Sequence, residues 1–396
     1  MLVVGASPFQ VPLIQTLQAH GDTTYAISNR PHDPGLQIAD CGASISILDF
    51  ERIESFIESE HIDYAITCGS DIATLTVARL NQKLGLPGCT EDQVLSVTHK
   101  GRFNTLLKQL NLNHVPFQNV AEESDINQIA DRIPRYPVIL KPVFSSGSRG
   151  IATAHSKEEI LTTHEHTLNA SFLFKGTVIQ EMIEGVEIGG ECLVEDSKVA
   201  FLEFTVKTNN QYRVPIGHFV PNLISDSVRS RIKEQIEAIA GHLGIKNTPV
   251  NIDTIITPDQ TPYIIDMSFR LGGNLLPDLM RLKYGFDPYG RIIDYTATEM
   301  IAPVAWSPNP KAYGCLIFYS DVDGTLTRQK MEDITGLLKP HAPIEMQFDI
   351  PESGRYQPFV EGSRRFGHAL CAFESLHAYQ ELLNNYSALI HRGPQG

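Results

Sequence analysis

Residues 138–151 read VILKPVFSSGSRGI, an apolar, strand-like run that ends in a lysine and leads into a loop of small residues. The loop, SSGSRG, contains serines and glycines, one arginine and no acid. Its glycines let the backbone fold over an anion, and its N–H groups and serine hydroxyls can donate hydrogen bonds. With Lys141 at the preceding strand end, the stretch predicts a phosphate-binding loop. The sequence does not match the P-loop consensus. The alternative to a phosphate-binding loop is a mobile surface loop.

Residues 251–274 read NIDTIITPDQTPYIIDMSFRLGGN and predict a metal-binding hairpin. Two strand candidates flank the turn TPDQTP, so that Asp253 and Asp266 can face one another across the hairpin. Paired carboxylates with the neighbouring oxygen of Ser268 suit a hard cation such as Mg²⁺ that bridges phosphates. Arg270 continues the alternation of residues 266 and 268, so we expect it on the same face. A surface hairpin with two isolated acids is the alternative.

Residues 180–187, QEMIEGVE, combine a strand end with a turn that is rich in glutamate. Backbone groups at a strand edge can pair with the donor and acceptor edge of a purine, and Glu187 could accept hydrogen bonds from two ribose hydroxyls. The stretch is therefore a candidate nucleoside site, with a solvated hairpin as the alternative.

The first part of the chain alternates strand and helix patterns. Strand candidates lie at residues 1–7, 23–29, 39–48 and 62–70, and helix candidates lie at residues 8–21, 50–61 and 71–85. This alternation predicts a parallel sheet with crossover helices. The turn GASPFQ (residues 5–10) lacks the GxGxxG spelling, which favours a plain strand–helix turn over a dinucleotide site.

From Lys100 the pattern changes to a mixed one. We expect helices at residues 99–111 and 225–244, and antiparallel strands over residues 177–204 with turns at EGVE and VEDSK. Prolines cluster in APVAWSPNPKAYG and indicate a boundary before a small C-terminal region. There FYSDVDGTLT imitates the nucleophile motif of haloacid-dehalogenase phosphatases, but no acid pair follows it, so a strand and a turn are the prediction.

Composition restricts the class of protein. The 396 residues are 42% hydrophobic and 20% charged, which is typical of a soluble globular chain of two or three domains. The net charge of −14 argues against binding to nucleic acid or to an anionic membrane. The N-terminus lacks a signal-peptide pattern, and the six cysteines form no CxxC pair, so we expect reduced thiols and a cytoplasmic location.

Taken in order, the three chemistry-bearing stretches resemble the ATP-grasp superfamily of carboxylate–amine ligases, which includes D-alanine–D-alanine ligase, biotin carboxylase and bacterial L-amino acid ligases. The resemblance extends over essentially the whole chain. It implies a fold of mixed α/β and α+β class. It also implies a Rossmann-like domain at residues 1–95, an ATP-grasp domain at 96–304 with a mobile lid at about 112–180, and a small α/β domain at 305–396.

The resemblance also assigns a role to individual residues. It implies that lysines and the small-residue loop contact the ATP phosphates, that the connector after the loop holds adenine, and that an acid binds the ribose. The residues with these nucleotide-binding roles are Lys100, Lys141, Ser145, Ser146, Gly147, Ser148, Gly150, Gln180, Glu181, Ile183 and Glu187. Lys141 and Arg270 become catalytic candidates, and Asp253, Asp266 and Ser268 become ligands for Mg²⁺ or Mn²⁺. The chain departs from the family where Glu and Asn are usual, because it has Asp266 and Ser268 there.

The function implied by the resemblance is ATP-dependent ligation of a small carboxylate to an amine, with amino acids among the candidates. An acyl phosphate forms, and ADP and phosphate are released. Nucleic acid and membrane are not expected partners, and a homodimer is an open expectation. An ATP-binding homologue without turnover is the first alternative, because of the altered metal ligands. A carboxylase-type enzyme that activates bicarbonate is the second.

Overall fold

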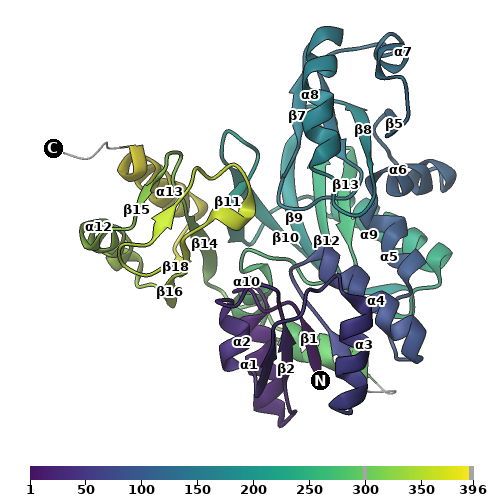
Figure 1. Cartoon of the computed structure of the whole chain (residues 1–396). Coiled ribbons are helices and arrows are strands. Elements are labelled where there is room, and N and C mark those ends of the chain that lie inside the picture. Colours follow the sequence, from purple (N-terminus) through teal and green to yellow (C-terminus); the bar gives the residue numbers. More distant parts are fainter. Residues whose placement is uncertain (298–300, 392–396) are drawn as a thin grey trace. The chain divides into compact units, whose positions relative to one another are not determined.

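The computed structural model describes residues 1–297 and 301–391 (Figure 1). The chain divides into two compact units. The first unit contains Met1–Leu202, Ile224–Gly273 and Asp287–Val304, and the second contains Glu203–Leu223, Asn274–Phe286 and Ala305–Gly396. The predicted three-domain boundaries therefore remain a prediction, since the second unit also takes up two short segments from the region expected to be ATP-grasp.

A parallel sheet opens the first unit, as the strand–helix alternation predicts. Its order is β3-β2-β1-β4, with β1 at Leu2–Val4, β2 at Tyr25–Ile27, β3 at Cys41–Ala43 and β4 at Ala65–Ile66. The helices that alternate with these strands are α1 (Val11–His20), α2 (Pro34–Ile38), α3 (Phe50–Ser59) and α4 (Asp71–Leu84). Apolar side chains from strands and helices, such as Leu2, Ile27 and Ile53, are fully buried together. The turn before α1 is held by Gln10, whose amide oxygen accepts hydrogen bonds from the Ser7 N–H and hydroxyl.

Two helices, α5 (Glu91–Thr98) and α6 (Lys100–Gln109), lead from this sheet to a second, antiparallel one. A short helix, α7 (Ile126–Ala130), follows the first strand of the second sheet. The strand order of this sheet is β5-β8-β6-β7, with β5 at Phe117–Ala121, β8 at Gly176–Glu181, β6 at Val138–Pro142 and β7 at Ala152–Ala154. Helix α8 (Lys157–Asn169) packs on this sheet, where Ile160 joins Val138, Leu140 and Ile179 in one apolar cluster. This sheet occupies the region predicted to be the lid.

The third sheet of the first unit carries the predicted metal hairpin. Its strands are β13 (Pro262–Ser268), β12 (Asn247–Ile256) and β9 (Val186–Glu195), paired antiparallel in that order. Helix α9 (Asp226–Leu243) packs against β13, and α11 (Pro288–Ala297) packs against β12. The prediction of strands over residues 177–204 is confirmed, but β8 and β9 do not pair with one another, because β8 lies between β5 and β6 and β9 lies beside β12.

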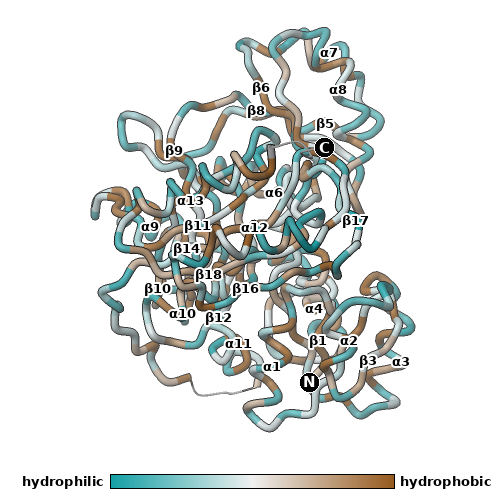
Figure 2. Tube along the Cα trace, turned by 90° about the vertical axis from the view of Figure 1, so that its left-hand side faces the viewer, coloured by the Kyte–Doolittle hydropathy of each residue, from teal (hydrophilic) through white to brown (hydrophobic). Residues whose placement is uncertain are grey.

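The second unit is an antiparallel sheet with helices. Strand β10 (Lys198–Asn209) continues into it, and the order is β10-β11-β14-β18-β16, with β11 at Pro215–Val220, β14 at Ala312–Phe318, β18 at Gly367–Phe373 and β16 at Glu345–Phe348. Strands β14 and β18 are largely hydrophobic (Figure 2). The remaining elements are α10 (Leu276–Tyr284), α12 (Arg328–Leu338), α13 (Leu376–His391), β15 (Gly324–Thr325) and β17 (Arg355–Tyr356). In the phosphatase-like DVDGT sequence, Asp321–Asp323 form the turn after β14 and Gly324–Thr325 form β15, so the predicted strand and turn are present.

Candidate active site

Lys141 lies in β6 with its side chain buried. The residue is 7% exposed, and its ammonium makes no hydrogen bond or ion pair with any residue that the structure describes. Burial lowers its pKa to about 8, although Asp266, Glu187 and Asp253 act in the opposite direction. These acids are close enough to influence the ammonium, so the lysine predicted to contact phosphate lies among the acids predicted to bind metal and ribose.

The loop after β6 has the backbone shape that its composition predicts. Gly147, Ser148 and Gly150 adopt left-handed conformations, with φ of 63°, 60° and 73°. At Gly150 a side chain would also be strained by contact, because an added Cβ would lie 2.2 Å from the Cβ of Ala170. The loop is stabilised internally, since the Ser145 hydroxyl donates to the Arg149 carbonyl at 3.2 Å. Ser146 accepts a hydrogen bond through its carbonyl from the Arg149 N–H.

Lys100 links the loop to the predicted metal site. It is the first residue of α6, and its N–H donates to the carbonyl of Val143 at 2.8 Å. Its ammonium lies 3.2 Å from the Asp266 carboxylate and donates to the Ser145 carbonyl at 3.3 Å. The two lysines predicted from separate parts of the sequence therefore approach the same carboxylate, one through an ion pair and one through its electrostatic influence.

The register of the third sheet aligns its polar residues on one face. Asp253 lies opposite Asp266, and Asn251 lies opposite Ser268. The prediction that the two acids face one another across the hairpin is thus confirmed. Since directly opposed residues share a face of a sheet, and side chains alternate along each strand, the same face receives acids from β9. These are Glu187, opposite Ile255, and Glu191, opposite Asn251.

The connector predicted to hold adenine follows the end of β8. Gln180 is buried, and its amide donates to Asn104 Oδ1 at 2.7 Å, so its side chain is engaged within the protein. The Glu181 N–H donates to the Pro116 carbonyl at 3.0 Å. Ile183 lies beyond the end of β8, outside any strand. This arrangement leaves the adenine-binding role of the connector a prediction.

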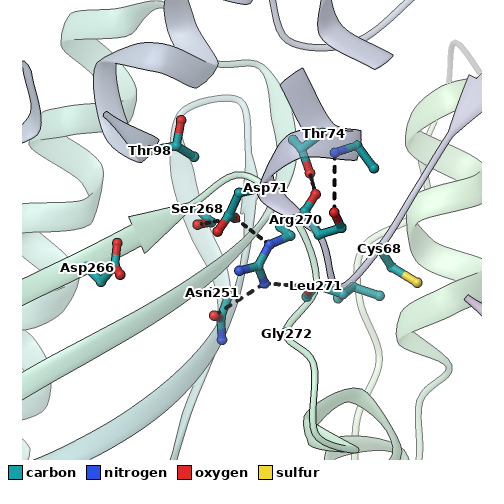
Figure 3. Close-up of polar contacts among 12 residues, drawn as sticks. Cys68, Asp71, Thr74, Thr98, Asn251, Asp266, Ser268, Arg270, Leu271 and Gly272 are labelled. Carbon is teal, nitrogen blue, oxygen red and sulfur yellow. Dashed lines mark hydrogen bonds and ion pairs between the residues drawn. The ribbon is translucent and has the colours of Figure 1, made fainter. Parts of the chain in front are cut away.

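Arg270 makes contacts that the sequence did not indicate (Figure 3). Its Nε lies 2.6 Å from Asp71 Oδ1, and its Nη1 donates to the Leu271 carbonyl at 3.1 Å and to Asn251 Oδ1 at 3.5 Å. The Ser268 hydroxyl donates to the same Asp71 oxygen at 2.8 Å. Arg270 lies beyond the end of β13, yet it shares a partner with Ser268, as expected for residues on one side.

Glu191 is a second acid that our sequence reasoning missed. Its Oε1 accepts hydrogen bonds from Asn251 Nδ2 at 2.7 Å and from the Gly272 N–H at 2.9 Å. Burial raises its pKa to about 8, against the lowering influence of Asn251 and Arg270. An acid inside the apolar run of β9 is the signal that could have identified it, because ionisable residues are rarely buried without a partner or a function. Asp71 carried no such signal, since acids are common in the first turn of a helix.

Comparison with known proteins identifies a domain family for part of the chain. Residues 134–278 match the ATP-grasp domain family. The chain contains an ATP-grasp domain at these residues. ATP-grasp proteins include ATP-dependent ligases, and the predicted fold, with its N-terminal parallel sheet followed by antiparallel sheets, is confirmed by matches over almost the full chain.

The relatives of this chain are distant. A formate-dependent phosphoribosylglycinamide formyltransferase from Hydrogenovibrio crunogenus is 25% identical over 55% of the chain and 53% of the relative, so the chain spans about half of that protein's length. The L-amino acid ligase of Bacillus licheniformis superposes with a TM-score of 0.78 at 16% identity, over 98% and 96% of the two chains. A biotin carboxylase domain from Hydrogenobacter thermophilus, solved with MgADP and bicarbonate, has a TM-score of 0.75 at 16% identity, over 97% and 88%.

The residues of this site fit a divalent cation bound together with nucleotide. Asp253 and Asp266 are opposed in register, and the Asp266 carboxylate already holds a cation, the ammonium of Lys100. Within residues 1–297 and 301–391 no group of three or more histidine, cysteine, aspartate or glutamate side chains could hold a metal by itself. Two carboxylates need further oxygen ligands, and phosphate oxygens are the partners that Mg²⁺ commonly uses.

Proposed function

We propose that the protein is an ATP-dependent carboxylate–amine ligase that forms an amide or peptide bond and releases ADP and phosphate. The observation that carries the proposal is the pair of lysines, Lys100 and Lys141, that converge on Asp266 next to the glycine-containing loop. A buried ammonium that forms no hydrogen bond or ion pair with residues 1–297 and 301–391 is costly, so Lys141 is best explained by an anionic ligand.

In the proposed reaction, a carboxylate oxygen of the substrate attacks the γ-phosphorus of ATP, and the bond to the bridging oxygen of ADP breaks. The amine nitrogen then attacks the acyl carbon, loses a proton, and inorganic phosphate leaves. No protein nucleophile is needed. Lys100, Lys141 and Arg270 would offset the negative charge on the phosphoryl group, which supplies most of the catalysis in such transfers.

The remaining assignments follow the same proposal. Residues 145–150 would cover the β- and γ-phosphates and exclude water from the acyl phosphate, which hydrolyses readily. Backbone groups at residues 180–183 would hold adenine, and Glu187 would bind the ribose. Asp253 and Asp266 would hold Mg²⁺ or Mn²⁺, which supplies charge stabilisation for the phosphates when bound. We further propose the domain boundaries given above and a homodimer, as in the related biotin carboxylase domain, whose structure is of a dimer.

A one-carbon carboxylate is the second candidate substrate. It is favoured by the formate-dependent transferase among the relatives and by the bicarbonate bound to the biotin carboxylase domain. Both candidates use the same phosphoryl transfer and differ only in the carboxylate that is activated.

The test is ADP release with ATP, Mg²⁺ or Mn²⁺, and a panel of amino acids, small carboxylates, formate and bicarbonate, each with and without amines. Addition of hydroxylamine would trap an acyl phosphate as a hydroxamate, and Asp266→Asn is the inactive control. Carboxylate-dependent ADP release supports the ligase. ATP binding without ADP release under any of these conditions would refute it and favour a nucleotide-binding homologue without turnover.

A further inference from the structure

Among the described residues, Asp71 is the one carboxylate to which both Ser268 and Arg270 donate hydrogen bonds. It is the first residue of α4, and the hydroxyl of Ser70 caps this helix by accepting a hydrogen bond from the Ala73 N–H. Asp71 Oδ1 accepts from Arg270 Nε at 2.6 Å and from the Ser268 hydroxyl at 2.8 Å (Figure 3). Asp71 lies outside residues 134–278, so the matched ATP-grasp segment does not contain it.

The contact is protected from solvent and remains charged. The Arg270 and Asp71 side chains are 12% and 14% exposed. Although burial alone would raise the pKa of the Asp71 carboxyl, the Arg270 guanidinium beside it makes the pKa lower than usual. A charge-assisted hydrogen bond of this kind is stronger than a neutral one and restricts the orientation of the guanidinium plane.

The other contacts of Arg270 complete its orientation. Nη1 is held by the Leu271 carbonyl and by Asn251, which is itself held by Glu191. Nη2 makes no hydrogen bond to any of the described residues. Three of the donor directions of the guanidinium are thus fixed from the protein side, and Nη2 remains for a ligand.

We propose that Asp71 is a positioning residue, which orients Arg270 toward the transferring phosphate, and that Ser268 belongs to this anchor rather than to the metal site. The proposal rests on the role of Arg270 in the proposed function. It changes the assignment of Ser268, because a hydroxyl that supports the Asp71 carboxylate contributes to the orientation of Arg270 and leaves the cation to Asp253, Asp266 and phosphate oxygens.

The competing explanation is a structural ion pair that only ties α4 to the end of β13. A structural tie would affect stability and every ligand alike. A positioning role would affect the γ-phosphate and spare the rest of the nucleotide, because Arg270 would contact only the phosphate that is transferred. The two explanations therefore differ in which ligand loses affinity.

The experiment measures nucleotide affinity by calorimetry for Asp71→Asn, with ADP and with a non-hydrolysable ATP analogue, both with Mn²⁺. Asparagine keeps the size and one acceptor oxygen but removes the charge. We expect ADP affinity within about twofold of wild type and analogue affinity about tenfold weaker. The matched control is Asp92→Asn, an acid in the first turn of α5 that pairs with Arg102 at 2.9 Å but is exposed, and it should change neither affinity.

A second variant, Ser268→Ala, tests the reassignment of the serine and can be measured even if Asp71→Asn does not fold. Ser268→Ala keeps the ion pair of Asp71 and should leave the Mn²⁺ concentration for half-maximal ADP binding unchanged, whereas Asp266→Asn should raise it at least about tenfold. In the double variant Asp71→Asn/Arg270→Gln, analogue affinity should equal that of Arg270→Gln alone, because Asp71 acts through Arg270.

These binding measurements test the inference without requiring turnover. Equal losses of ADP and analogue affinity in Asp71→Asn, additive losses in the double variant, or a raised Mn²⁺ requirement in Ser268→Ala would overturn it. These results would leave the ligase proposal standing. Conversely, absence of ADP release would refute the ligase, while the affinities would still report whether Asp71 orients Arg270.

Discussion

Replacement of Lys141 by methionine should stabilise the fold and weaken ATP binding. The change removes a buried ammonium and keeps an unbranched side chain of similar length. The folded-state pKa of about 8, against an ordinary value of 10.5, corresponds to roughly 3 kcal/mol of unfavourable burial of the charged form. We therefore expect Lys141→Met to raise the free energy of unfolding at pH 7, with roughly 3 kcal/mol as the upper limit.

The gain should depend on pH with a definite sign. Between about pH 8 and pH 10.5 the unfolded chain binds more protons at residue 141 than the folded chain, so the stability of the wild type rises with pH in this range. Below pH 8 the penalty for the buried charge is present in full. The stability difference between Lys141→Met and the wild type should thus be largest at pH 7 and should shrink toward pH 10.

The assays are urea unfolding at pH 7 and pH 9.5 and calorimetric titration with ATP at pH 7. Lys141→Arg is the matched control, because it keeps a buried charge and should give no gain in stability. A Lys141→Met protein that is less stable than the wild type at both pH values, and that binds ATP with unchanged affinity, would refute the reasoning. Such a result would mean that the lysine serves the core and not a ligand.

Four further outcomes are expected. The ATP affinity of the wild type should fall about tenfold from pH 7 to pH 9, because Lys141 of the protein without nucleotide loses its proton with a pKa of about 8. An ATP affinity that does not change with pH would contradict the assignment of Lys141 to phosphate binding. Gly147→Val with Gly150→Val should slow turnover more than it weakens adenosine binding, and equal losses would point to a structural role for the loop. Asp266→Asn should abolish metal-dependent turnover in the ADP-release assay, and full activity would remove this acid from the mechanism. Glu187→Gln should weaken ADP and adenosine binding alike, measured by calorimetry, whereas a loss confined to ADP would reject the ribose assignment.

Local patterns predicted the parts of the site that local geometry determines. Alternation and the turn TPDQTP were sufficient to place Asp253 opposite Asp266, because side-chain direction in a strand has a period of two. The left-handed backbone at Gly147 and Gly150 likewise follows from the residue type. These features involve residues that are close in sequence or that belong to one hairpin.

Long-range pairing could not be predicted in this way. The contact between Asp71 and Arg270 joins residues 199 positions apart, and nothing in DIATL distinguishes this acid from an ordinary first-turn acid. The sequence pattern also did not indicate that β8 and β9 belong to different sheets. Apolar and polar side chains alternate in the same way along a strand whichever strand lies beside it. The pattern therefore predicts where strands occur but not which strands pair.

The anchor has a consequence for chimeric proteins built from ATP-grasp relatives. Lys100 and Asp71 both lie before residue 134, yet each pairs with a residue of the matched segment. If a donor sequence replaced the N-terminal region without an acid at position 71, Arg270 would be a buried cation without its counter-ion, a defect that typically costs about 3–5 kcal/mol. We therefore expect recombination at this junction to succeed when residues 71, 268 and 270 are exchanged together. These three positions would then be inherited as one unit, although they lie in two parts of the chain.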